Sequence, residues 1–241
     1  PSSITADEAR MRLVQVMAAL AADAGMPGAL APAAAVLSCV VPALERPWKM
    51  ALSRTCTGRV LTVGPGLKTG MPVHYDDPAE IGPDRIADAV AARAVYGSPC
   101  IVIDLGTTTN IEVIDTHGTF VGGVIAPGLA LGARSLSAAA ARLPQVEPSA
   151  PTHVIGRNTR EAMRSGVVLG EVARIDGMLD MVLAEMRATK AAGEGDVPIV
   201  ITGDDAEALA ALVGHSLTVD DALTLRGLAE LYHINQKPRR A

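Results

Sequence analysis

The stretch "CIVIDLGTTTNIEVIDTHGTFVGGVI", residues 100–125, decides the fold of this chain. It holds three runs of apolar, strand-forming residues, at 100–105, 110–115 and 120–125. The turn between the last two runs has Asp115 first and Gly118 fourth, the pattern that a type I β-turn prefers. We therefore expect three consecutive strands joined by short turns.

Helices alternate with strands on both sides of this stretch. Thr5 and Glu8 form a capping box that opens a helix ending at Gly25. Further helices are predicted at 43–55 (its first turn broken near Pro47), at 82–96, from about 127 to just before 144, in a longer region after 158, in a short stretch after 203, and at 220–235. Further strands are predicted at 34–41, 59–63 and 198–202. This alternation indicates an α/β protein.

Composition narrows the class of protein. The chain has 241 residues, is 49% apolar and only 2% aromatic, and carries a net charge of −5, so its core is expected to be aliphatic. Basic residues cluster only in the tail "KPRR", which argues against a nucleic-acid partner. No apolar run is long enough to span a membrane, and Cys39 and Cys100 lie in apolar runs as expected for buried reduced thiols. These features predict a cytoplasmic globular protein.

The segment "DLGTTTN" is the first candidate site. Asp104 ends an apolar strand, where an unpaired carboxylate is costly to bury. In one interpretation Asp104 holds a cation, Gly106 lets backbone N–H groups approach a phosphate, and the hydroxyls of Thr107 and Thr108 add donors. In the other interpretation the segment is only a tight hairpin. The residues alone leave both open.

The segment "IGPDRIADAV" is the second candidate. Gly82 precedes the helix, and Pro83 occupies its first position. Asp84 in the first turn is explained by the helix dipole alone, but Arg85 has the wrong sign for that end. Together the two charged residues are able to orient a hydroxyl nucleophile and an anionic substrate.

Other polar segments have simpler explanations. The glycine-rich "GPGLKTG" at 64–70 is followed by Pro72, which forbids the helix that a phosphate loop needs, so a surface turn is predicted. Asn158 is expected to cap the helix that follows it, and Asp204 and Asp205 are expected to cap the short helix after 203.

Four quoted segments together resemble the type III pantothenate kinase family: "IGPDRIADAVAA", "IVIDLGTTTNIEVIDTHGTFVGGVIAPGL", "LPQVEPSAPTHVIGRNTREAMRSGVVLGEVARIDGM" and "LTVDDALTLRGLAELYHIN". The resemblance runs from about Thr5 to Asn235. It implies an actin-like, ribonuclease H-like ATPase fold of two related domains, here 1–98 and 99–241, and a homodimer. It also implies transfer of the γ-phosphate of ATP to the primary hydroxyl of pantothenate, the first step of coenzyme A synthesis, with potassium or ammonium as monovalent cation and magnesium accompanying ATP.

The same resemblance assigns roles to single residues. Asp84 would be the proton acceptor and Asp104 would hold the cation, while Thr107, with Gly106 and Thr108 beside it, would contact ATP. The residues that would line the pantothenate site are Tyr75, Gly82, Pro83, Asp84, Arg85 and Thr159.

The chain also departs from the family pattern. The family opens with a D-x-G-N-T turn and two further strands, whereas this chain begins at what matches the first helix, so the first domain is expected to lack its opening strands. Asn110 and Glu112 stand where the family has threonine and aspartate, and Asp204 replaces a glycine on the adenine side. Two rival hypotheses follow: a non-catalytic paralogue that binds pantothenate or a related ligand, and another actin-like phosphotransferase for a different hydroxyl substrate.

Overall fold

The computed structural model describes residues 3–26 and 31–236, so the tail "KPRR" lies outside the described residues. The chain divides into two compact units, which are described separately. Unit 1 comprises residues 1–70, 77–87 and 228–241, and unit 2 comprises residues 71–76 and 88–227. The division into domains 1–98 and 99–241 stays a prediction. No helix in the described ranges is both long and apolar enough to cross a membrane.

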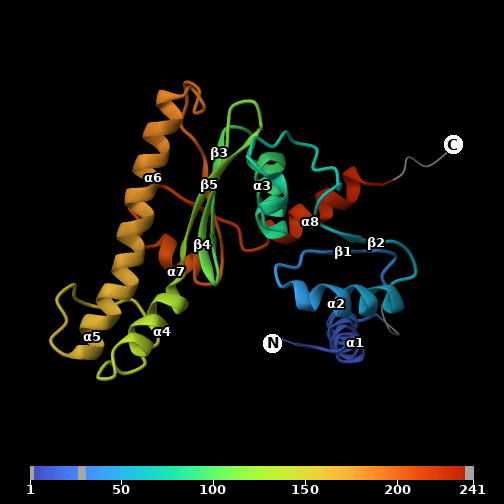
Figure 1. Cartoon of the computed structure of the whole chain (residues 1–241), viewed down its shortest axis with the longest axis horizontal. Coiled ribbons are helices and arrows are strands. Elements are labelled where there is room, and N and C mark those ends of the chain that lie inside the picture. Colours follow the sequence, from blue (N-terminus) through green and yellow to red (C-terminus); the bar gives the residue numbers. More distant parts are fainter. Residues whose placement is uncertain (1–2, 27–30, 237–241) are drawn as a thin grey trace. The chain divides into compact units, whose positions relative to one another are not determined.

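Unit 1 holds two complete helices and a small sheet, together with the start of a third helix and the end of the last one (Figure 1). Helix α1 (Ala6–Asp23) begins with the predicted capping box, in which Glu8 N donates to Thr5 Oγ1 and Thr5 N donates to Glu8 Oε2. Strands β1 (Ala35–Leu37) and β2 (Val60–Thr62) pair in parallel. The glycine-rich segment 64–70 forms a turn, as predicted, with Leu67 N bonded to Gly64 O.

Helix α2 (Pro42–Thr55) corrects one expectation. It runs without interruption through Pro47, where a broken first turn was predicted. Pro47 lacks an N–H and so removes one i→i−4 hydrogen bond near the start of the helix, and α2 tolerates this loss.

Unit 2 is built on a five-stranded sheet in the order β5-β4-β3-β6-β7. The predicted trio is confirmed as an antiparallel meander of β3 (Cys100–Leu105), β4 (Thr108–Ile114) and β5 (Phe120–Pro127). Gly118 N donates to Asp115 O, which closes the turn between β4 and β5. Strand β6 (Ile199–Gly203) pairs in parallel with β3, and the two-residue strand β7 (Thr218–Val219), too short to predict, pairs with β6.

The remaining helices of the described residues belong to unit 2, except that the start of α3 and the end of α8 belong to unit 1. The helices are α3 (Pro83–Tyr96), α4 (Leu129–Ala139), α5 (Thr159–Arg164), α6 (Gly170–Ala188), α7 (Ala206–Ala210) and α8 (Leu223–Ile234), with a π-helical turn at Ser165–Leu169 and a 3-10 turn at Pro78–Glu80. Helix α6 lies along one face of the sheet (Figure 1), where Ile175 and Leu179 pack in a core with Ile103 and Ile201. The fold is therefore α/β, and its core is aliphatic, as predicted.

Two local expectations are wrong. Cys100 is buried, but Cys39 lies beyond the end of β1 and is only half-buried. Asp205 precedes α7 in a left-handed conformation (φ 62°) and makes no side-chain capping bond. A capping residue normally has an extended backbone that turns its side chain onto the first N–H groups of the helix, and Asp205 does not adopt it.

Candidate functional site

Asp104 lies at the carboxyl end of β3, in a row of polar residues that crosses three strands of unit 2. It is paired in register with Asn110 of β4 on one side and with Thr202 of β6 on the other. Neighbours in register point to the same face of a sheet, so these three side chains share one face. The row brings a carboxylate, an amide and a hydroxyl together, and oxygen atoms are the ligands that hard cations prefer.

The turn between β3 and β4 presents the predicted phosphate-side residues. Gly106 and Thr107 are exposed at its tip, and Gly106 N donates to Thr108 O at 3.0 Å. Gly128, which precedes the first turn of α4, donates its N–H to Thr107 O at 3.0 Å. A Cβ atom on Gly128 would overlap the carbonyl oxygen of Gly106, so only glycine permits this approach.

A second glycine, Gly203, lies against Asp104 from the neighbouring strand β6. Gly203 ends β6 with φ at +91°, and a Cβ atom there would meet Leu105 O and would lie 2.8 Å from Asp104 Oδ1. The carboxylate therefore sits against bare backbone, at the carboxyl ends of two parallel strands. Open α/β sheets bind their ligands at such ends.

Asp84 and Arg85 lie in the first turn of α3, in unit 1. The Asp84 carboxylate lies over Gly82, because a Cβ on that glycine would collide with Asp84 Oδ1, and the same oxygen accepts a 2.9 Å hydrogen bond from Arg85 N. Arg85 is only 5% exposed, and a charged side chain buried to this degree normally has an interaction partner. Pro83 is the first residue of the helix, as predicted.

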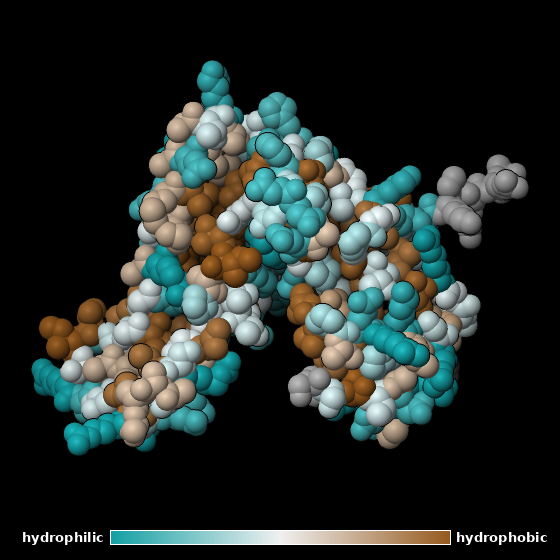
Figure 2. All heavy atoms as spheres, in the orientation of Figure 1, coloured by the Kyte–Doolittle hydropathy of each residue, from teal (hydrophilic) through white to brown (hydrophobic). Residues whose placement is uncertain are grey.

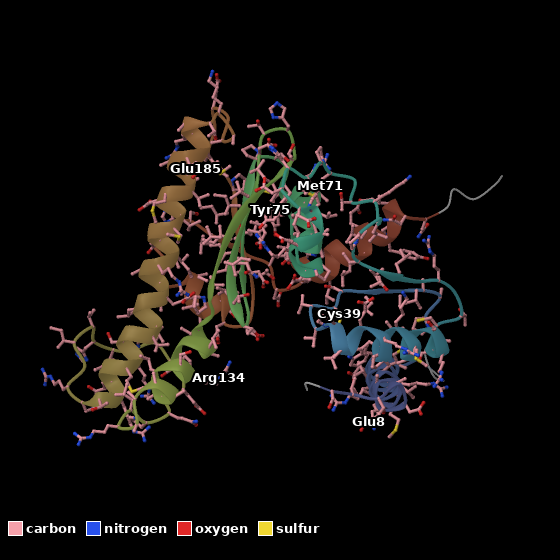
Figure 3. The ribbon with its side chains drawn as sticks, in the orientation of Figure 1. Glu8, Cys39, Met71, Tyr75, Arg134 and Glu185 are labelled. Carbon is pink, nitrogen blue, oxygen red and sulfur yellow. The ribbon has the colours of Figure 1, made fainter. Side chains whose placement is uncertain are left out.

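Tyr75 and Thr159 both belong to unit 2 but lie apart. The ring of Tyr75 lies beside β5, with its centroid 6.1 Å from that of Phe120 (Figure 3). Thr159 begins α5, at the opposite end of the unit (Figure 1). Asn158 caps that helix, as predicted, by accepting from Glu161 N at 3.0 Å.

The structure brings the predicted residues into groups. Asp104, Gly106, Thr107 and Thr108 form one group in unit 2, and Gly82, Pro83, Asp84 and Arg85 form another in unit 1.

Sequence reasoning missed the two glycines that shape the first group, Gly128 and Gly203. It also missed Glu171 and Arg174, which lie beneath that group. The sequence signals available for the two glycines were the position of Gly203 at a strand end and that of Gly128 just before a helix. No local pattern points to Glu171 or Arg174.

Comparisons with known proteins place these motifs in one family. The sequence profile described as type III pantothenate kinase matches residues 2–181. A type III pantothenate kinase of Koribacter versatilis is 42% identical over 205 residues, which are 85% of this chain and 72% of that protein. A type III pantothenate kinase 2 of Symbiobacterium thermophilum is 39% identical over 96% of this chain and 84% of that protein.

A solved structure gives a further likeness. A protein of Campylobacter jejuni described as a Baf family transcriptional activator has a TM-score of 0.50 and 23% identity, with 73% of each chain covered. This likeness shows a shared fold.

Proposed function

This chain belongs to the type III pantothenate kinase family, the ATP-dependent kinases that phosphorylate pantothenate for coenzyme A synthesis, and we propose how its own residues serve that reaction. The primary hydroxyl oxygen of pantothenate attacks the γ-phosphorus of ATP, the bond from that phosphorus to the bridging oxygen of ADP breaks, and the hydroxyl proton passes to Asp84. The observation that carries the proposal is the Asp84 carboxylate, held over Gly82 at the start of α3.

The demands on Asp84 are modest. Phosphoryl transfer passes through a loose transition state, in which positioning and charge neutralisation matter more than a strong base. Arg85 is proposed to bind the carboxylate of pantothenate, and Gly82 and Pro83 to line its site.

Thr107, with Gly106 and Thr108, is proposed to receive the phosphates of ATP. The exposure of Gly106 and Thr107 at the tip of the turn supports this role, because phosphate oxygens accept hydrogen bonds from hydroxyl groups such as those of Thr107 and Thr108. Asp104 is proposed to hold a monovalent cation, potassium or ammonium, together with oxygen atoms from Asn110 and Thr202. Such a cation would neutralise negative charge on the phosphates, and magnesium is expected to accompany ATP.

A homodimer is part of the same proposal. Tyr75 and Thr159 lie at opposite ends of unit 2, so a pantothenate site that uses both needs Thr159 from a second copy of the chain. The loop before α5 offers a surface for that contact, because Val154 and Ile155 are exposed there, Ile155 at 82%. Figure 2 shows hydrophobic surface at the end of the unit where α5 lies in Figure 1. The actin-like pairing of two domains, 1–98 and 99–241, and a cytoplasmic location belong to the proposal as well.

A coupled assay tests the function. Purified protein is given ATP and pantothenate, with and without potassium, and ADP release is followed. We expect release that depends on both pantothenate and potassium. Calorimetric binding of pantothenate without any ADP release at high ATP would instead favour the non-catalytic binder, with Asp204, exposed between β6 and α7, as the first residue to exchange.

A further inference from the structure

A buried carboxylate lies beneath the turn that carries Thr107. Glu171, in the first turn of α6, is only 4% exposed, and its Oε1 accepts a 2.6 Å hydrogen bond from Thr109 Oγ1. Thr109 is itself buried and follows Thr108 directly on β4. A buried charge of this kind is costly unless it is paired and hydrogen-bonded.

Arg174, one helical turn further along α6, supplies the pairing. Its Nη2 binds Glu171 Oε2 and also donates to the carbonyl oxygen of Pro127 at 2.5 Å. Pro127 is the last residue of β5, and the next residue, Gly128, donates to Thr107 O. The network therefore holds the turn from two sides, through Thr109 on β4 and through the corner between β5 and α4.

Apolar packing holds this corner only in part, since Leu129 at the start of α4 packs against the core that contains Val172 of α6. A groove of about 330 Å³ opens there between α4 and α6, with Gly132, Gly166 and Gly170 in its lining. The three glycines offer no side chains to α4 in this groove, and the hydrogen bond from Arg174 adds a polar tie at the carbonyl of Pro127, where β5 ends. The π-helical turn at Ser165–Leu169 directly precedes Glu171's helix, and such turns are frequent near functional sites.

We propose that Glu171 and Arg174 are positioning residues for nucleotide binding: they hold the β3–β4 turn and Gly128 in the geometry that receives the phosphates. The inference rests on the proposed contact of Thr107 with ATP. Neither residue touches the nucleotide in this scheme. Their effect is to keep the donors of the turn in place before the ligand arrives, so that less ordering is needed on binding.

Substitutions at Arg174 test the idea. Arg174→Met keeps most of the side-chain volume but removes both donor contacts, and Arg174→Lys keeps the charge. We expect Arg174→Met to raise the Kd for ADP with magnesium and the KM for ATP about tenfold, with the KM for pantothenate unchanged. Arg174→Lys should recover part of the loss.

A matched control lies on the same helix. Asp176 binds the backbone N–H of Gly214 and the ring of His215, away from the β3–β4 turn. Asp176→Asn should lower stability while leaving both KM values and the Kd for ADP as in the parent protein. Equal effects of Arg174→Met on the two substrates, or an unchanged Kd for ADP, would overturn the proposal.

Amide hydrogen exchange gives a readout that does not depend on turnover. The amides of Gly106 and Gly128, bonded to Thr108 O and Thr107 O, should exchange faster in Arg174→Met than in the parent protein, and not in Asp176→Asn. Unchanged exchange at both amides would contradict a positioning role. If the parent protein binds ADP but does not phosphorylate pantothenate, the proposed function fails, while ADP affinity and exchange still decide the role of Arg174. Should Arg174→Met fail to fold, Glu171→Gln takes its place in the same measurements, with a smaller shift of the same sign expected.

Discussion

The N–H of Gly128 donates a 3.0 Å hydrogen bond to the carbonyl oxygen of Thr107, which joins the start of α4 to the turn between β3 and β4. The bond forms because Gly128 has no Cβ: with one, the residue would meet the backbone oxygens of both Gly106 and Thr107. The turn and the start of the helix are therefore joined, and a substitution at Gly128 should displace the backbone of Thr107.

Gly128→Ala should separate α4 from this turn. We expect the Kd for ADP to rise about tenfold, because the displaced turn no longer presents its donors correctly. Gly132→Ala is the matched control in the same helix, where nothing lies within 4 Å of a new Cβ. That control should stabilise the protein by about 0.5–1 kcal/mol and leave ADP binding unchanged. Calorimetry and thermal unfolding measure both effects, and equal ADP affinities for the two variants would contradict the coupling.

Asp84→Asn should abolish turnover while pantothenate binding stays nearly intact. The amide has almost the same shape and still accepts the hydrogen bond from Arg85 N, but it cannot take a proton from the hydroxyl. Steady-state kinetics and calorimetry with pantothenate make the comparison. Wild-type turnover in this variant would exclude Asp84 as the base.

Asp104→Asn should remove the dependence of the reaction on potassium. The variant keeps an oxygen in the row with Asn110 and Thr202 but loses the charge that would attract a cation. ADP release is measured over a potassium series, with Asp204→Asn as the control for a nearby exposed carboxylate. The same potassium dependence in Asp104→Asn and in the parent protein would rule out a cation at this residue.

The three cysteines should differ in reactivity. Burial raises the pKa of the Cys100 thiol to about 12, so the reactive thiolate is nearly absent at pH 8. We expect Cys39 and Cys56 to react with a thiol reagent in the native protein, Cys56 more slowly because burial also raises its pKa, and Cys100 only after unfolding. Peptide mass analysis after timed labelling tests this, and early labelling of Cys100 would argue that β3 opens readily.

Acid should weaken the contact between α6 and the loop at 214–215. Burial opposes the charged form of Asp176, but hydrogen bonds from His215 and from Gly214 N outweigh it and hold the pKa of Asp176 below its usual value. A carboxyl whose pKa is lowered by folding contributes stability above its unfolded pKa of about 3.9, and the contribution is lost as pH falls through the lower folded value.

Asp176→Asn should therefore reduce the free energy of unfolding by about 1 kcal/mol at pH 7, with the difference shrinking below about pH 4. Urea unfolding at several pH values measures it. Asp180→Asn is the control, because the Asp180 side chain is 76% exposed and its contact with His215 should contribute little. A difference for Asp176→Asn that does not vary between pH 7 and pH 3 would exclude the assigned cause.

Much of the fold was predictable from local patterns. Strand β3 was predicted with the bounds that the structure has, the capping box at Thr5 and the helix start at Pro83 are confirmed, and the meander β3-β4-β5 follows from short turns. The errors concern two rules for single residues: that proline breaks a helix and that an aspartate before a helix caps it. Pro47 is tolerated inside α2 because only one hydrogen bond is lost, and Asp205 takes a left-handed conformation in place of a capping one.

The sequence by itself determined which residues are candidates for the site, because Asp84, Arg85, Asp104 and Thr107 belong to short motifs that can be recognised from neighbouring positions alone. Only the tertiary structure decided what surrounds them. Thr109 and Glu171 are 62 positions apart, and Arg174 and Pro127 are 47 apart. Contacts over such separations depend on strand register and on how a helix crosses the sheet, and neither leaves a local periodicity in the sequence.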